Sequence, residues 1–367
     1  MTSRTLTDVE DVRARVDAVL VQQAATLRQH LNAISTDALA LAEPVDQMLT
    51  GGKRLRAALC YWSWRLHGGS AAEPDASSVI RVAAALELFQ AAALFHDDVI
   101  DDSDRRRGVP TAHRTLAEQH RANHWRGSSE RFGSAAAILL GDLCLVASEE
   151  KFSSARPGLD DGAFEHAREA FDEMRTEVTI GQFLDIRAQA LPLGDDPAAD
   201  LDRARTVIRA KAARYSVEHP VVIGAALAGA SAEQLARCRA FGLPLGEAFQ
   251  LRDDLLGVFG EPATTGKPAG DDLREGKRTV LVALALQHAD ANDRAFIANR
   301  LGDPGLTPDD VERLRGILLG SGAVAGVEAL IASLRAEAMA ALGTIDGTSD
   351  GAEMMRRLAQ ALVDRSA

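Results

Sequence analysis

Residues 82–108 read VAAALELFQAAALFHDDVIDDSDRRRG, an apolar stretch rich in Ala and Leu that ends in a cluster of acids. This composition and length are typical of a buried helix. On a helix, the carboxylates of Asp97, Asp98 and Asp101 project to one side because they are three or four residues apart. Like charges at these spacings repel unless a cation offsets them, and hard oxygen ligands favour Mg²⁺ shared with phosphate groups. The alternative for this cluster taken alone is a solvated acidic helix end followed by a basic loop.

A second acidic pair, Asp253 and Asp254, ends another apolar stretch, residues 241–251. The segment that follows, residues 266–279, reads GKPAGDDLREGKRT and combines glycines with lysines, as expected for a loop that closes over an anion. Two acidic clusters, each followed by basic residues, indicate a polyanionic ligand that binds through metal. Diphosphate is the simplest such ligand.

The composition of the whole chain favours helices and limits its partners. Of 367 residues, 46% are hydrophobic but only 4% are aromatic, which indicates a core of small and aliphatic side chains between helices. A net charge of −12 argues against nucleic acid as a partner. Widely spaced cysteines, the lack of a signal-peptide pattern and the lack of a run of about 18 apolar residues predict a cytoplasmic protein without a transmembrane segment.

Periodicity along the chain predicts one all-α domain, residues 1–367, with N-terminal helices in residues 1–45 and C-terminal helices in residues 300–367. Ser77 or Ser78 is the expected N-cap of the helix that leads to Asp97. The polar residues 118–133 are expected to form a loop. Further helices are predicted at 55–66, 135–148, 164–190, 199–228, 231–259, 279–289, 307–319 and 322–342, with a last short helix after Gly351.

Seven motifs occur along the chain in a fixed order. They are residues 51–56 (GGKRLR), the first acidic cluster with Arg106-Arg107-Gly108, residues 181–185 (GQFLD), Lys211, Phe249-Gln250 with Asp253-Asp254, Gly266-Lys267, and Lys277. In these motifs and their order, residues 51–279 resemble the trans-isoprenyl diphosphate synthases of the polyprenyl synthetase family. Each motif alone is weak evidence, but the ordered set is specific.

The resemblance implies a helical bundle around a central cavity, which is the isoprenoid synthase fold. It also implies a reaction between isopentenyl diphosphate and an allylic diphosphate. The allylic diphosphate ionises to a carbocation, the double bond of isopentenyl diphosphate attacks it, and a proton is lost. Three Mg²⁺ ions per site, replaceable by Mn²⁺, and a homodimeric assembly are implied as well.

The resemblance assigns roles to individual residues. Metal binding is expected of Asp97, Asp98, Asp101, Asp253 and Asp254. The allylic substrate is expected to contact Arg106, Lys211, Gln250 and Lys267 under a flap that Lys277 helps to close. Isopentenyl diphosphate is expected to bind Lys53, Arg56, Gln90 and Arg107, and Gln182 and Asp185 are expected near the metal and the reacting carbon. For Lys211 alone the alternative is a solvated surface charge, and for Gln90 alone it is an ordinary helix amide.

The second acidic motif departs from the family pattern DDxxD, because Gly257 stands where its last acid is expected. Two carboxylates remain in this motif. We therefore expect metal binding to survive, with a weaker affinity or a greater demand for Mg²⁺.

The length of the product is expected to depend on the helix before the first acidic cluster. The growing chain would extend from Asp97 toward the helix N-terminus, where Ala92 and Ala93 stand in place of the aromatic residue usual in farnesyl diphosphate synthases. Phe89, about 12 Å from Asp97 along a helix, is the next bulky side chain. Geranylgeranyl diphosphate (C20) is the expected product, with a longer polyprenyl diphosphate or farnesyl diphosphate as the alternative.

Two other functions compete with this interpretation. A terpene cyclase has no isopentenyl diphosphate to bind, so the basic residues Lys53 and Arg56 argue against it. A non-catalytic regulatory subunit of a synthase typically loses one aspartate cluster, whereas both clusters are present here.

Overall fold

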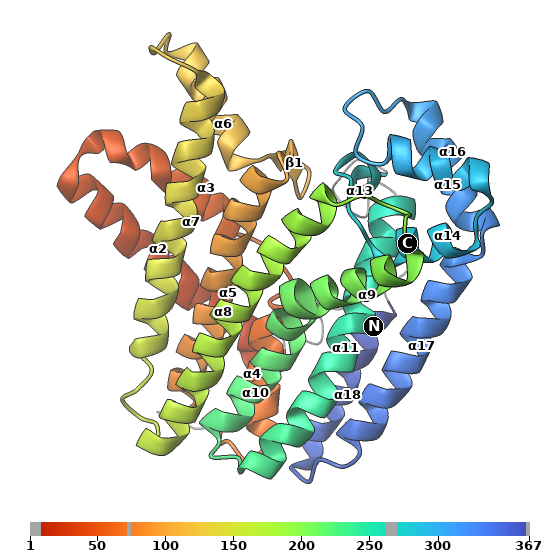
Figure 1. The fold of residues 1–367 in the computed structure, drawn as a ribbon. Helices are drawn as coiled ribbons and strands as arrows, with labels where there is room; N and C mark the ends of the chain where they lie inside the picture. Colours follow the sequence, from red (N-terminus) through yellow and green to blue (C-terminus); the bar gives the residue numbers. More distant parts are fainter. Residues whose placement is uncertain (1–8, 72–74, 261–269, 365–367) are drawn as a thin grey trace. The chain divides into compact units, whose positions relative to one another are not determined.

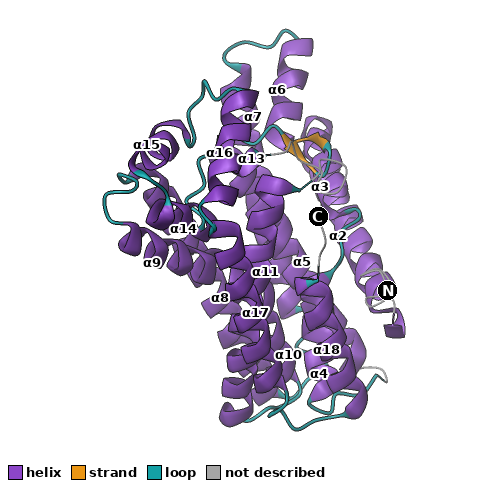
Figure 2. Cartoon of the chain, turned by 90° about the vertical axis from the view of Figure 1, so that its right-hand side faces the viewer, coloured by secondary structure: helices purple, strands orange, loops and turns teal. Residues whose placement is uncertain are grey.

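The computed structural model describes residues 9–71, 75–260 and 270–364, and in these residues all regular structure is helical except one two-stranded hairpin (Figures 1 and 2). The predicted all-α class is therefore confirmed. The described residues group into two compact units. The first contains Met1–His166, Gly224–Ala230 and Gly347–Met354, and the second contains Ala167–Ile223, Ser231–Asp346 and Met355–Ala367. Gly266 and Lys267 lie outside the described residues.

The first unit is built around one long apolar helix, α5. Its elements are η1 (Val9–Asp11), α2 (Val12–Ile34), η2 (Thr36–Leu41), α3 (Ala42–Leu49), α4 (Leu55–Leu66), α5 (Asp75–Ile100), β1 (Arg105–Arg106), β2 (Val109–Pro110), α6 (Ala112–Ala122) and α7 (Ser129–Ser153). Helices α2, α4 and α7 pack against α5, and residues 82–89 of α5 are buried continuously. Burial on all sides explains why this stretch lacks the alternation of apolar and polar faces that a surface helix shows.

The second unit is built around α11. Its complete elements are α9 (Pro197–Val207), η3 (Ile208–Glu218), α11 (Ala232–Phe259), α13 (Asp271–Arg274), α14 (Val280–His288), α15 (Ala291–Arg300), α16 (Pro308–Gly320) and α17 (Ala323–Leu342). The chain passes between the units within α8 (Asp161–Ala190), α10 (His219–Leu227) and α18 (Ser349–Val363). Helix α11 begins with a capping box in which the Ser231 hydroxyl accepts from the Gln234 N–H and the Gln234 side chain accepts from the Ser231 N–H.

Element η3 is an uncommon π-helix of 11 residues that contains Lys211. Its wide backbone approaches its neighbours closely where those neighbours have no side chain. A Cβ added at Gly181 of α8 would lie 2.4 Å from the Lys211 backbone nitrogen, and one at Gly246 of α11 would lie 2.4 Å from the Ala213 carbonyl oxygen. Both distances are too short for a real Cβ, so these glycines allow η3 to lie where it does.

Several boundaries predicted from the sequence were wrong. Helix α5 begins at Asp75, so Ser77 and Ser78 lie inside the helix, and the Ser78 hydroxyl donates instead to the Pro157 carbonyl. Most of residues 118–133 are helical, because Ser128 caps an early start of α7. The sequence also gave no indication of α15, of the β1–β2 hairpin, or of the π-type winding inside the predicted helix 199–228.

The sequence predicted no stretch long and apolar enough to span a membrane. By length and composition, this prediction was wrong. Residues 76–100 have a mean hydropathy of 1.6 with 78% of the window buried, and α7 has 1.5 with 39% buried. The bent pair α16 and α17 passes the same test together. Isolated polar residues such as Glu87 do not lower the average enough, so a rule based on uninterrupted apolar runs missed these helices.

The close approach at Gly246 makes a testable prediction. Replacing Gly246 with Ala should lower the free energy of unfolding by about 1 to 3 kcal/mol, because the added methyl group collides with the η3 backbone. Gly316, in the middle of α16 with open space around its Cβ position, provides the matched control. Gly316→Ala should be neutral or slightly stabilising, since Ala favours helix over Gly. Chemical denaturation of both variants measures the difference, and equal midpoints would contradict the packing argument.

Candidate active site

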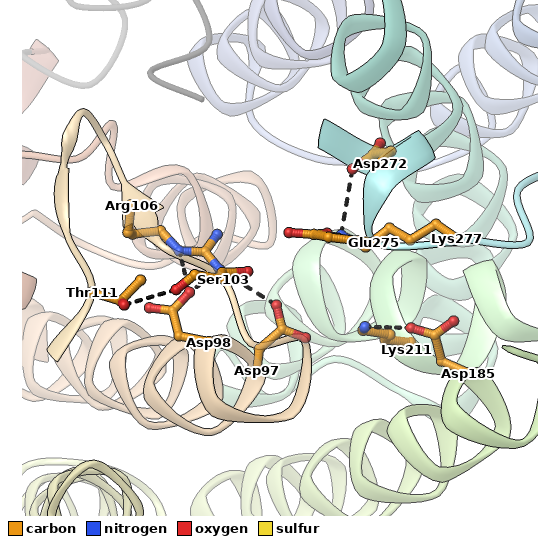
Figure 3. Close-up of polar contacts among 10 residues, drawn as sticks. All are labelled: Asp97, Asp98, Ser103, Arg106, Thr111, Asp185, Lys211, Asp272, Glu275 and Lys277. Carbon is orange, nitrogen blue, oxygen red and sulfur yellow. Dashed lines mark hydrogen bonds and ion pairs between the residues drawn. The ribbon is translucent and has the colours of Figure 1, made fainter. Parts of the chain in front are cut away.

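The first acidic cluster lies in the last turns of α5 and is held by an arginine from the hairpin that follows. The Arg106 guanidinium donates from Nε to Asp98 Oδ1 at 2.9 Å, and its Nη2 lies 3.5 Å from Asp97 Oδ2 (Figure 3). The Asp98 side chain is 2% exposed, so its charge depends on this contact. Asp101 follows directly after α5 and is half-buried.

The β1–β2 hairpin gives Arg106 its position. Its two central residues, Arg107 and Gly108, both have positive φ (53° and 81°), as in the type I′ turns that join two strands tightly. The Thr111 hydroxyl fastens the base of the hairpin by donating to the Ser103 carbonyl at 2.8 Å (Figure 3). The chain therefore reverses direction directly after α5, and the Arg106 guanidinium lies against Asp97 and Asp98 in the last turn of that helix.

Basic residues gather beside this hairpin in the first unit. Arg107 Nη1 donates to the Thr50 carbonyl at 3.2 Å, and partial burial together with nearby Arg54, Arg106 and Arg56 lowers the pKa of Arg107. A guanidinium crowded by other cations favours an anion next to it. This neighbourhood agrees with the predicted anion-binding role of Arg56 and Arg107, while Lys53 is exposed on the same loop.

Arg54 has no role among the sequence-based predictions, although it is the most buried cation of residues 51–56. Arg54 is 5% exposed, its Nε donates to Asp17 at 2.7 Å, and its Nη1 lies 3.6 Å from Glu87. It also donates to the Leu49 carbonyl. These protein contacts fix the loop, so Arg54 holds the position of its neighbours. A run of basic residues does not show which of them contacts the protein and which faces a ligand.

In the second unit, Lys211 and Asp185 form an ion pair. Lys211 Nζ donates to Asp185 Oδ2 at 2.6 Å, which joins η3 to α8 (Figure 3). Gln182 lies one helical turn before Asp185 and is half-buried. Three of the predicted site residues thus lie together, although they belong to segments far apart in the sequence.

The second acidic cluster lies near the end of α11. Gln250 Nε2 donates to Asp254 Oδ1 at 2.8 Å, and the Asp254 side chain is almost fully buried. The pKa of Asp254 is raised to about 7, first by burial and then by nearby Asp272 and Asp253, while Gln250 and Lys277 act in the opposite direction. A buried carboxylate surrounded by other carboxylates lacks positive charge, which is what a divalent cation would supply.

The segment around α13 contributes acids that the sequence reading did not assign. Lys277 Nζ lies 2.6 Å from Glu275 Oε2 and 3.5 Å from Asp272 Oδ1 (Figure 3). Lys277 therefore lies beside the second cluster and pairs with protein carboxylates, and its role in closing the flap over the allylic diphosphate stays a prediction. The pair Asp271-Asp272 within the glycine-punctuated segment was the signal that could have drawn attention to them.

The donor groups of both clusters suit Mg²⁺, which prefers carboxylate oxygens. Within the described part of the chain, no three acidic, histidine or cysteine side chains converge closely enough to hold a metal ion by themselves. In the first unit Arg106 contacts Asp98 and Asp97, and in the second unit Lys277 contacts Asp272 and Glu275.

Comparison with known proteins identifies the class of this site. The Polyprenyl synthetase family matches residues 39–318. The chain belongs to this family. A geranylfarnesyl diphosphate synthase of Aeropyrum pernix is 34% identical over 75% of the chain and 77% of its own length. A crystal structure of a geranylgeranyl pyrophosphate synthase from Corynebacterium glutamicum, complexed with isoprenyl diphosphate and magnesium, is 37% identical, covers 100% of both chains and has a TM-score of 0.89.

The predicted family, fold and enzyme class are thereby confirmed, and the protein is a trans-prenyltransferase of the diphosphate synthase type. Products named for its relatives differ in chain length, since a geranylgeranyl diphosphate synthase of Saccharolobus solfataricus is also 29% identical over 73% of both chains. Family membership therefore fixes the reaction type and leaves the product to be argued from residues.

The raised pKa of Asp254 predicts how pH changes the stability of the metal-free protein. An acid with a folded-state pKa above its unfolded value keeps a proton in the folded state that the unfolded chain releases, so its contribution favours folding at lower pH. For Asp254 this contribution should disappear as the pH rises from about 4 toward about 7. Relative to Asp254→Asn, the wild-type melting temperature should fall by a few degrees across this window and level off above it.

Differential scanning fluorimetry of both proteins without metal measures this difference. Added Mg²⁺ should reduce it, because a bound cation favours the ionised carboxylate. Parallel pH profiles for the two proteins would contradict the assigned pKa.

Proposed function

We propose that the protein makes all-trans geranylgeranyl diphosphate (C20) from isopentenyl diphosphate and an allylic diphosphate. The family match spans residues 39–318, which include parts of both units, so we infer one catalytic domain for the whole chain. The observation that carries the product assignment is the series of side chains on α5, in which small Ala92 and half-buried Ala93 precede Asp97 and bulky Phe89 lies further back.

The contacts of α5 support a chain-length role for Phe89. The Ser148 hydroxyl of α7 donates to the Ala85 carbonyl at 2.7 Å, and the ring of His96 also contacts the α7 backbone. Ala85, Phe89, Ala92 and His96 are spaced four, three and four residues apart, so they share one stripe of α5 that faces α7. A product chain that follows this stripe from Asp97 passes Ala92 and then meets the Phe89 ring, which is 4% exposed.

The chain's own residues supply the binding and positioning in this reaction. Asp97, Asp98 and Asp101 in the first unit and Asp253 and Asp254 in the second are the proposed metal ligands. When bound, Mg²⁺ neutralises the charge that builds up on the departing diphosphate. Arg106, Lys211, Lys267 and Lys277 are proposed to hold the allylic diphosphate, while Lys53, Arg56, Gln90 and Arg107 are proposed to hold isopentenyl diphosphate. Gln182, Asp185 and Gln250 are the proposed polar neighbours of the reacting groups.

Product analysis tests the proposal directly. The purified protein is incubated with Mg²⁺, isopentenyl diphosphate and either dimethylallyl, geranyl or farnesyl diphosphate, and the dephosphorylated alcohols are separated by length. A C20 alcohol is expected. A longer product would keep the reaction and overturn the chain-length argument, and no elongation with any primer would favour a regulatory subunit. Replacing Mg²⁺ with Mn²⁺ in the same assay tests the proposed substitution.

Two opposite substitutions test the role of the α5 stripe. Phe89→Ala should lengthen the main product by at least one five-carbon unit, because the bulky side chain is removed. Ala92→Phe should shorten it toward C15, because a ring is added nearer to Asp97. Phe95→Ala removes a buried ring from the same helix outside the stripe and serves as the control. If both stripe variants fold, as judged by circular dichroism, and give an unchanged product distribution, the side chain that limits product length lies elsewhere.

We also propose that the protein is a homodimer that pairs through α7 and acts in the cytoplasm. Phe132, Leu139 and Val146 repeat every seven residues on α7 and are 37%, 54% and 57% exposed. A heptad-spaced apolar stripe of this kind is suited to packing against another helix, and a second copy of the chain offers an identical one. The burial of Cys60, Cys144 and Cys238 as thiols agrees with a reducing compartment.

Charge introduced into this stripe should separate the subunits. Leu139→Glu combined with Val146→Glu is expected to shift the protein from dimer to monomer in sedimentation velocity, because two desolvated carboxylates would face each other at the interface. Leu319→Glu changes an equally exposed apolar residue on α16 and should leave the assembly unchanged. A wild-type protein that sediments as a monomer would contradict the proposal.

A further inference from the structure

The position left without an acid in the second motif is already occupied by a carboxylate from another segment. A Cβ built at Gly257 would lie 1.9 Å from Oδ2 and 2.6 Å from Cγ of Asp272. Such distances mean that the Asp272 carboxylate lies where a side chain at residue 257 would begin. Gly257 and Asp272 therefore depend on each other, since any larger residue at 257 would displace the carboxylate.

Helical spacing explains why this location matters. Residue 257 is four residues after Asp253 and three after Asp254, so a side chain there would lie beside both acids on the same face of α11. Without a cation, Asp272 and these two acids do not converge closely enough to form a metal site, and Asp272 is paired with Lys277. We propose that a bound cation draws Asp272 toward Asp253 and Asp254, so that it serves as the third carboxylate of the second metal site in place of the acid that Gly257 lacks. The proposal rests on the proposed function, because the ligand in question is the Mg²⁺–diphosphate pair of that site. With Asp272 as a ligand, the second site would have three carboxylates, so the weaker metal affinity expected from Gly257 would not apply.

The backbone around α13 holds Asp272 in this position. Gly270 begins α13 with a φ of 75°, and the Asp272 carbonyl accepts from the Lys277 N–H at 3.0 Å. The Leu273 carbonyl accepts from the Gly302 N–H at 3.0 Å, which ties α13 to the end of α15. The short helix is thus fixed at both ends, and the carboxylate does not depend on a single side-chain contact for its place.

The side-chain contacts of Asp272 leave it able to accept a cation. Its side chain is 14% exposed, and the Lys277 ammonium group lies 3.5 Å from Asp272 but 2.6 Å from Glu275. When a cation binds Asp272, Lys277 keeps its closer partner Glu275 or turns to the diphosphate. Among the described residues, a metal at Asp272 would therefore replace the long ion pair that Lys277 shares between Asp272 and Glu275.

Isothermal titration calorimetry with inorganic diphosphate, at a series of Mg²⁺ concentrations, tests the proposal on the full-length protein. Asp272→Asn removes one charge with little change in shape, and we expect it to raise the Mg²⁺ concentration required for half-maximal diphosphate binding by about ten-fold or more. Asp271→Asn changes the neighbouring acid on the same short helix and is the matched control, expected to stay within about two-fold of wild type. Equal Mg²⁺ dependence of Asp272→Asn and wild type would overturn the proposal.

A relocation of the acid provides the second test. Gly257→Asp combined with Asp272→Ala moves the third carboxylate to α11, and we expect the Mg²⁺ requirement to return to within about three-fold of wild type. Gly257→Ala keeps every acid but pushes Asp272 aside, so it should raise the Mg²⁺ requirement even if Asp272→Asn fails to fold. A double variant that is no better than Asp272→Asn, with a wild-type circular dichroism spectrum, would contradict the replacement.

The outcomes separate this proposal from the proposed function. If the wild-type protein binds no diphosphate at any Mg²⁺ concentration and elongates no primer, the function itself fails. If the wild type binds diphosphate with Mg²⁺ and the Asp272 and Gly257 variants behave identically to it, only the assignment of Asp272 fails.

Discussion

Acidic side chains held within one helical turn repel one another, and the rest of the site depends on how this repulsion is offset. In each compact unit the protein's own cations do so. Arg106 lies over Asp98 and Asp97, Lys211 pairs with Asp185, and Lys277 lies between Asp272 and Glu275. Two unit charges about 4 Å apart attract by about 4 kcal/mol at an effective dielectric constant of about 20.

These internal ion pairs make the two classes of ligand interdependent. A metal that binds the acids alone would leave Arg106 and Lys211 facing no anion, and a diphosphate that binds these cations alone would leave the acids facing one another. Under the proposed function, we therefore expect the binding of metal and the binding of diphosphate to reinforce each other.

The fold class and the family could be predicted from the sequence, because helical periodicity and short ordered motifs are local signatures. Acids three and four residues apart on an apolar helix are expected to share a face, and Asp97 and Asp98 lie in the last turn of α5 with Asp101 directly after it. Features that depend on contacts between distant segments could not be predicted. Arg54 belongs to a basic motif but contacts Asp17 and Glu87, and the π-type winding around Lys211 depends on Gly181 and Gly246.

Missing side chains shape this site as much as present ones do. Gly181 and Gly246 admit the backbone that carries Lys211, and Gly257 admits the carboxylate of Asp272. A sequence motif gives the residue type expected at each position, so Gly257 in place of an acid suggests that a metal ligand is missing. A cation instead responds to where the carboxylates lie, whichever segment supplies them. An acid missing from α11 is therefore no deficit when the space it would fill holds an acid from α13, and the glycine becomes a requirement of the site.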